Sequence, residues 1–210
     1  MKLALFGGTG RIGTRIAQEA LARGHEVTVM VRNAARLTYN HRNLTIIRGN
    51  VLDPANIAKT AANADAAISA IGPVDGDPSI LISSAQAIID GLNRAGVKRL
   101  VVVGGAGSLE TASGVLVMDT PTFPAAWKPV AQAHQDALGV YRESNLDWTF
   151  FSPAALIEPG ERTGKYRTGT DQLVTDADGK SLISMEDYAV ALLDEVEKPR
   201  FIRQRFTAAY

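Results

Sequence analysis

Residues 3–21, LALFGGTGRIGTRIAQEAL, carry the strongest signal for the fold. A short apolar run ends at Phe6, glycines follow at positions 7, 10 and 13, and apolar residues then recur at helical spacing. Glycine permits the tight turn that carries a chain from a buried strand into a helix packed against it. The stretch therefore predicts a strand, a turn and a helix at the start of a βαβ unit.

The next 130 residues repeat this alternation. Runs such as VTVMV lack polar alternation, which is typical of parallel strands covered by helices on both faces. Strands are predicted at residues 2–6, 26–31, 44–48, 64–69, 99–103 and 147–151, and helices at 11–23, 54–63, 79–95 and 128–144. Gly24 and Gly96 stand where a helix end favours a left-handed residue. The repeated βα order predicts an α/β fold with one doubly wound parallel sheet, the Rossmann fold.

Two segments depart from this order. Residues 153–210 predict a short strand near 181–183, a helix at 185–197 and a last strand around 204–207. We interpret them as a small α/β extension on the substrate side, so that residues 1–210 form a single domain. The connection 104–127 has few periodic apolar positions, and loops of that length tend to be functional or mobile.

Composition excludes several classes of function. The chain has 22 Lys plus Arg and 22 Asp plus Glu, so its net charge of zero argues against nucleic acid and anionic membranes as partners. It has no cysteine, and its three histidines are scattered, so no disulfide and no metal site is expected. No apolar run reaches the roughly 18 residues of a membrane helix, and glycines interrupt the first run. We expect a cytoplasmic monomer or homodimer.

The glycine turn has a specific physical use. Because glycine lets backbone approach closely, a pyrophosphate can lie on the free N–H groups at the amino end of the following helix. Thr9 and Ile12 would offer the nearest amides, beside Gly7, Gly10 and Gly13. The alternative is that the glycines only pack a strand against a helix. The surrounding βαβ pattern favours binding of a nicotinamide dinucleotide.

Arginines predict which dinucleotide is preferred. Arg32 stands nineteen positions after Gly13, where NAD-binding folds carry an acidic residue for the ribose 2′-hydroxyl. An arginine there would meet a 2′-phosphate instead, and Arg11 and Arg36 are close enough in sequence to join it. NADP is therefore expected in preference to NAD. The alternative for Arg32 and Arg36 is a pair of solvated surface side chains.

Two further strand ends carry candidate contacts. In GNVLD, Asp53 and the amide of Val51 or Leu52 would contact adenine, although Asp53 before Pro54 is also a typical helix N-cap. After the fourth strand, backbone near Ser69, Ala70 and Gly72 can approach the cofactor ribose, and a structural turn explains these residues nearly as well.

The segments FGGTGRIG, GNVLD, SAIG, VVVGGAGS and ESNLDWTFFSPA resemble the atypical short-chain dehydrogenase/reductases. The chain is most similar to their NADH-flavin reductase, or NAD(P)H-binding, group, which is related to biliverdin reductase B, and the resemblance runs from residue 1 to about 207. It implies dinucleotide contacts at Gly7, Thr9, Gly10, Arg11, Ile12 and Arg32. It also implies a nicotinamide platform near Gly104, Gly105, Ser152, Pro153 and Ala154.

The chain departs from the superfamily at one pair of residues. Ordinary members use a Tyr-x-x-x-Lys pair as proton donor, and the matching positions here are Val130 and His134. One hypothesis is a reductase that passes hydride to a flavin- or quinone-like acceptor, which needs no dedicated acid. His134 or Ser108 is then the candidate catalytic proton donor; little is expected of Tyr141, Tyr166 and Tyr188. An apolar cover for the planar acceptor would come from Met118, Phe123 and Trp127.

The alternative hypothesis is a non-catalytic NADP-binding redox sensor, similar to the regulatory NmrA-like proteins. It explains the missing pair without a further assumption. The sensor predicts an exposed apolar surface for a partner, whereas the reductase predicts a closed pocket over the nicotinamide.

Overall fold

The computed structural model describes residues 1–73 and 76–210. Its strands are β1 (Lys2–Phe6), β2 (Glu26–Val31), β3 (Leu44–Arg48), β4 (Ala66–Ser69), β5 (Arg99–Val103), β6 (Asp147–Ser152), β7 (Leu156–Glu158), β8 (Arg167–Gly169), β9 (Leu182–Ser184) and β10 (Gln204–Ala209). Its α-helices are α1 (Arg11–Ala22), α2 (Pro54–Ala61), α3 (Ile80–Ala95), α4 (Lys128–Arg142) and α5 (Met185–Glu197).

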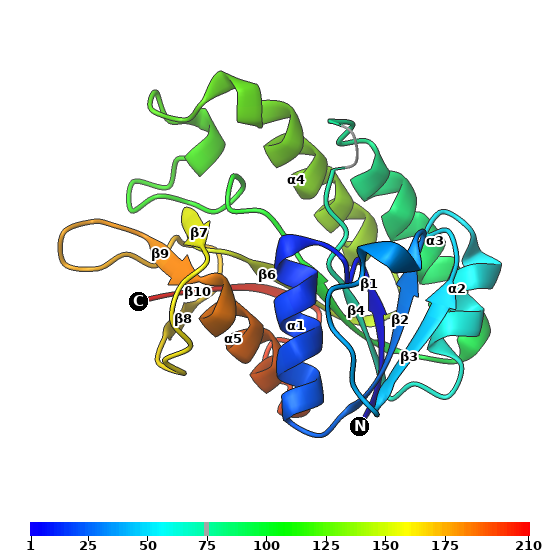
Figure 1. Cartoon of the computed structure of the whole chain (residues 1–210). Coiled ribbons are helices and arrows are strands. Elements are labelled where there is room, and N and C mark those ends of the chain that lie inside the picture. The colour runs from blue at the N-terminus through cyan, green and yellow to red at the C-terminus, as the bar shows by residue number, and fades with distance from the viewer. Residues whose placement is uncertain (74–75) are drawn as a thin grey trace.

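One large sheet organises the molecule (Figure 1). Its strand order is β3-β2-β1-β4-β5-β6-β10-β8, and every neighbouring pair is parallel except β10 and β8. The chain starts at β1, builds outward to β3, and then returns to β4 on the other side of β1. The predicted doubly wound fold is confirmed. Ligands of such folds bind where the strand order reverses, here beyond the carboxyl ends of β1 and β4.

Helices cover both faces of the sheet, as the unalternating apolar strands predict. Helices α1 and α5 pack together on one face, and α2, α3 and α4 lie on the other (Figure 1). Between α5 and the sheet, the ring of Phe151 stacks between Tyr188 and Phe206, with centroids 4.0 Å from each. On the opposite face Phe6, Phe150 and Trp148 are buried. Two apolar cores therefore hold the sheet in place.

Most predicted elements lie within a few residues of their observed bounds. Strand β4 begins at Ala66 rather than at residue 64; before it, the amide of Asp65 donates to the carbonyl of Lys2 (2.8 Å), and its carboxylate accepts from the amide of Lys2 (2.7 Å). Gly24 and Gly96 have φ angles of 82° and 73°, as predicted for helix ends. No helix in the described part of the chain is long and apolar enough to cross a membrane.

The segment after Pro153 contributes more to the sheet than its sequence predicts. Strand β10 pairs with β6 and extends to Ala209, while β8 adds an antiparallel edge. Strands β7 and β9 form a separate parallel pair. The sequence predicts neither β7 nor β8, because each is only three residues long and mostly solvent-exposed.

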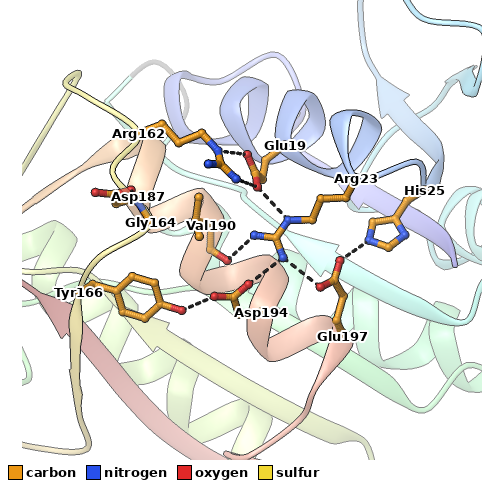
Figure 2. Close-up of polar contacts among 10 residues, drawn as sticks. All are labelled: Glu19, Arg23, His25, Arg162, Gly164, Tyr166, Asp187, Val190, Asp194 and Glu197. Carbon is orange, nitrogen blue, oxygen red and sulfur yellow. Dashed lines mark hydrogen bonds and ion pairs between the residues drawn. The ribbon is translucent and has the colours of Figure 1, made fainter.

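Polar side chains fasten the carboxyl end of α1 to α5 (Figure 2). Glu19 accepts hydrogen bonds from Arg23 Nε (2.8 Å) and from Nε and Nη2 of Arg162 (2.8 Å each). Arg23 Nη1 also reaches Asp194 Oδ1 at 2.7 Å and Glu197 Oε2 at 3.0 Å. The hydrogen bonds from Arg162, and then those from Arg23, hold the pKa of Glu19 below its usual value against the effect of burial.

Candidate cofactor-binding site

The glycine turn lies between β1 and α1, at the edge of the sheet where β1 ends (Figure 1). Gly7 has a φ angle of 87°, and a Cβ atom there would lie 2.3 Å from the carbonyl oxygen of Ala70. A Cβ atom at Gly13 would lie 2.1 Å from the carbonyl oxygen of Gly7. Both positions therefore require glycine, since the turn packs directly against β4 and against its own helix.

The amino end of α1 is open. The amide of Gly10 donates to the carbonyl of Gly7 (3.1 Å), and the first intrahelical bond runs from the amide of Thr14 to the carbonyl of Gly10 (2.9 Å). The amides of Arg11, Ile12 and Gly13 precede that bond. In residues 1–73 and 76–210, no side chain caps this end and no acidic residue stands in the first turn. The helix end therefore suits an anion, whose charge complements the helix dipole.

A fourth glycine completes the turn, and the motif spacing did not single it out. The carbonyl oxygen of Gly8 accepts hydrogen bonds from the Tyr39 hydroxyl (3.0 Å) and from Thr14 Oγ1 (3.2 Å). A Cβ atom at Gly8 would lie 2.4 Å from Cγ2 of Val29. The doublet FGG was the available signal for Gly8, whereas Tyr39 is 31 positions away and carries no local motif.

Three exposed arginines lie at or near this edge of the sheet. Arg11 opens α1, Arg32 directly follows β2, and Arg36 ends the short 3-10 helix Ala34–Arg36. In the part of the chain that the structure describes, none of the three forms an ion pair. Their guanidinium groups therefore remain available to a bound phosphate.

The expected N-cap role of Asp53 is confirmed. Its carboxylate accepts from the amide of Ala55 (2.9 Å) and from the side-chain amide of Asn56. The amide of Leu52 donates to Oδ1 of Asn50 (3.1 Å), and Val51 is buried. The contact of Asp53 and Val51 with adenine stays a prediction.

The carboxyl ends of β4, β5 and β6 form a small-residue edge beside the turn. Ser69 is buried, the amide of Ala70 donates to the carbonyl of Phe6 (2.8 Å), and Gly72 is exposed. Across the sheet, a Cβ atom at Gly104 would lie 2.1 Å from the ring of Phe150. Gly104 is therefore a glycine because the Phe150 ring packs on its backbone, whereas a Cβ atom at Gly72 would meet nothing within 4 Å.

Ser152, Pro153 and Ala154 are buried at the end of β6. The Ser152 hydroxyl has no hydrogen-bond partner among the described residues. A buried polar group without a partner is costly, so this hydroxyl is suited to meet a polar group of a ligand.

The two candidate proton donors have different surroundings. His134 packs on the backbone of Gly105, where a Cβ atom would lie 2.9 Å from its ring, and burial lowers the pKa of His134 to about 4. The hydroxyl oxygen of Ser108 accepts from Nη1 of Arg205 (3.1 Å). His134 is therefore neutral at neutral pH, and Ser108 keeps only its hydroxyl hydrogen for donation.

The tyrosines have structural surroundings, in line with the sequence-based expectation. Tyr141 is buried against Phe150, Tyr166 donates to Asp194, and the Tyr188 hydroxyl donates to the carbonyl of Phe151 (2.6 Å).

The segment 104–127 folds back on itself. Met118 is buried, and its amide donates to the carbonyl of Gly107 (2.8 Å), so it packs inside the loop. Trp127 is 61% exposed and meets the half-buried Phe123 edge to face at 6.4 Å. Of the three residues expected to cover an acceptor, Phe123 and Trp127 are therefore the two at the surface.

Comparison with known proteins agrees with a dinucleotide-binding site at this edge of the sheet. The model of the NAD(P)H-binding family matches residues 7–199. The Bacillus subtilis protein YwnB is 39% identical over 211 residues, which cover 99% of this chain and 97% of YwnB. A Burkholderia pseudomallei structure, provisionally named an exported protein, is 53% identical over 100% of both chains, with a TM-score of 0.91.

A Streptococcus pneumoniae structure, provisionally named an NADH-flavin reductase, is 36% identical and covers 100% of this chain and 99% of its own, with a TM-score of 0.87. These matches extend over the glycine turn, the sheet and the segment after Pro153. The resemblance found in the motifs is confirmed: the chain belongs to the NAD(P)H-binding family.

Proposed function

We propose that the protein is an NADPH-dependent reductase that passes hydride to a flavin- or quinone-like acceptor. The observation that carries this proposal is the open amino end of α1 together with Arg11, Arg32 and Arg36, which are exposed and unpaired within the described residues. Such an arrangement suits a pyrophosphate and a 2′-phosphate on one nucleotide.

The residues present fit a dinucleotide along the whole edge. The pyrophosphate would lie on the amides of Thr9, Arg11 and Ile12, with Gly7 and Gly13 allowing close approach. Arg32 would hold the 2′-phosphate, and Asp53 with Val51 would contact adenine. The ribose would pass Ser69, Ala70 and Gly72, and the nicotinamide would lie at Gly104, Gly105, Ser152, Pro153 and Ala154. When bound, the cofactor would supply the hydride.

The proton inventory favours an acceptor that needs little acid catalysis. Val130 and His134 occupy the positions of the usual Tyr-Lys pair, and the depressed pKa of His134 makes its charged form scarce at neutral pH. A flavin or quinone spreads the charge of an arriving hydride over its rings. The protein would then mainly position donor and acceptor, with Ser108 or water completing the proton transfer.

The acceptor would lie under the aromatic pair of Phe123 and Trp127. Trp127 exposes its planar indole ring at the start of α4. Planar ligands stack on such side chains. The streptococcal relative, provisionally named an NADH-flavin reductase, supports this class of acceptor.

The redox sensor is a second candidate, and one surface favours it. Leu156 and Leu182 are register partners on β7 and β9 and are 47% and 39% exposed. The amide of Tyr210, itself exposed, donates to the carbonyl of Leu182 (3.0 Å). Adjacent exposed apolar side chains are the kind of surface that a partner protein covers.

A reductase that draws on NADPH needs a pool of reduced cofactor, so we place the protein in the cytoplasm. The Burkholderia relative is provisionally named an exported protein. Fractionation of cells that produce the protein separates the two locations.

The proposal is tested by following the absorbance of NADPH and of NADH with free flavin and a simple quinone as acceptors. Turnover that prefers NADPH supports the reductase. In Arg32→Glu, affinity for NADPH should fall roughly 10- to 100-fold because a charge-assisted contact becomes repulsive, whereas NADH should be little affected. Arg94→Glu, an equal charge reversal on the exposed end of α3, is the control. Tight NADPH binding without turnover on any acceptor would favour the sensor.

A further inference from the structure

The segment 32–42 carries two of the three arginines; Leu37 and Tyr39 pack against the core, but few hydrogen bonds join the segment to the rest of the fold. It connects β2 to β3, and most of its hydrogen bonds lie within the segment. The amide of Arg36 donates to the carbonyl of Asn33 (3.2 Å), and the amide of Ala35 donates to Oδ1 of Asn33 (3.0 Å). Among the hydrogen bonds of the described residues, that from the Tyr39 hydroxyl to the Gly8 carbonyl is the one that joins this segment to chain outside residues 31–44.

The surroundings of Tyr39 make this bond well defined. Its ring is half-buried and packs against the core between α1 and the sheet. Burial raises the pKa of Tyr39 to about 12, so its hydroxyl stays protonated and donates at any ordinary pH. A Cβ atom at Gly8 would lie 2.9 Å from the Tyr39 oxygen, so glycine at position 8 is what lets the hydroxyl reach the turn.

Gly8 belongs to the turn that would hold the pyrophosphate, and Arg32 and Arg36 belong to the segment that would hold the 2′-phosphate. Tyr39 thus links the turn proposed for the pyrophosphate to the segment proposed for the 2′-phosphate. The Thr14 hydroxyl donates to the same carbonyl but comes from α1, so it supports the turn without touching the segment. The two hydroxyls provide a natural pair for comparison.

We infer that Tyr39 is a positioning residue that determines selectivity for the 2′-phosphate, by fixing the arginine segment against the glycine turn. The inference rests on the proposed preference for NADPH. Without the hydroxyl, the segment has more conformations available, and ordering it over the phosphate lowers affinity. A ligand without the 2′-phosphate does not need the segment and is spared that loss.

The test measures binding of two cofactor fragments by calorimetry, so it does not depend on turnover. Adenosine 2′,5′-bisphosphate carries the 2′-phosphate, and adenosine 5′-monophosphate lacks it. Tyr39→Phe should weaken the bisphosphate about threefold to tenfold, the scale of one hydrogen bond, and the monophosphate less than about twofold. Tyr166→Phe, which loses a tyrosine hydroxyl bond to Asp194 on α5, should change neither.

Two further variants separate positioning from general loosening. Thr14→Val should weaken both fragments alike, because it acts on the turn alone. In an Arg32→Gln background, Tyr39→Phe should have little further effect on the bisphosphate, because Arg32→Gln has already removed the contact that Tyr39 positions; this completes a double-mutant cycle. Thermal unfolding of each variant checks that it is folded.

The outcomes distinguish this inference from the proposed function. If wild-type protein binds the bisphosphate no better than the monophosphate, the preference for NADPH fails, and the role of Tyr39 fails with it. If wild-type protein shows the preference but Tyr39→Phe keeps it, or weakens both fragments equally, only the inference about Tyr39 is overturned.

Discussion

The two ends of α1 differ in how their polar groups are satisfied. At the carboxyl end, the side chains of Glu19 and Arg23 form ion pairs with Arg162, Asp194 and Glu197 of the same chain (Figure 2). At the amino end, within the described residues, three amides have no capping side chain.

The carboxyl end of the helix therefore stabilises the fold, whereas the amino end is left free for a ligand. Buried charges must be paired, and the carboxyl end meets that requirement within the chain. The amino end lies at the strand-order reversal, where the fold favours ligands, and remains open to an anion. Changes at the two ends should therefore have separable effects on binding and on stability.

The largest expected effect comes from Gly13→Ala at the amino end. The added Cβ atom would meet the Gly7 carbonyl at 2.1 Å and displace the turn. Dinucleotide affinity should fall roughly 10- to 100-fold, the scale of losing charge-assisted hydrogen bonds to the pyrophosphate. The control is Gly139→Ala on α4, where a Cβ atom meets nothing within 4 Å, and which should stabilise the protein by about 0.5–1 kcal/mol. Calorimetric titration and urea unfolding check both; unchanged affinity in Gly13→Ala would contradict the account.

Glu19→Gln at the carboxyl end should affect stability and not binding, the opposite of Gly13→Ala. Loss of the charged acceptor should lower the free energy of unfolding by about 1–3 kcal/mol while leaving dinucleotide affinity unchanged. The pKa of Glu19 is lowered by folding, so its contribution is present above the unfolded pKa and is lost as pH falls through the folded pKa. Urea unfolding of both proteins at neutral pH and below pH ~4 should show their difference shrinking with acid. A difference independent of pH would mean that the charge is not the cause.

The smallest effect is expected for Arg162→Ala. Its side chain is 55% exposed, and Arg23 still pairs with Glu19 in its absence. The free energy of unfolding should fall by less than about 1 kcal/mol, and by less still at high salt. Denaturant midpoints at two salt concentrations measure this; a loss as large as that of Glu19→Gln would show that Arg162 rather than Arg23 holds the carboxylate.

Most of the fold could be predicted because its signals are local. Buried parallel strands such as β2, with VTVMV at residues 27–31, lack polar alternation, and Asp53 before Pro54 is a cap that can be predicted from two residues. The sequence does not predict strands β7 and β8, because each has three mostly exposed residues and so shows no hydrophobic periodicity. The pairing of Glu19 with Arg162 spans 143 positions, and only the folded chain brings them together.

The candidate site divides in the same way. The glycine turn and Arg32 are predicted by short spacings, and the structure places them at one edge of the sheet. Tyr39 was missed because its partner Gly8 is remote in sequence and the contact runs to a backbone carbonyl. Met118 was expected to help cover the acceptor and is instead buried inside the loop, because residues without periodicity give no sign of which side chains turn inward.

The central claim is that the amino end of α1 binds the pyrophosphate of NADP. The most direct test is to follow the backbone amide resonances of the isotope-labelled protein by NMR during titration with NADP. We expect large shifts at residues 9–13 and at Arg32, and little change at residues 19–23. Saturation with NADP that leaves residues 9–13 unshifted would contradict it.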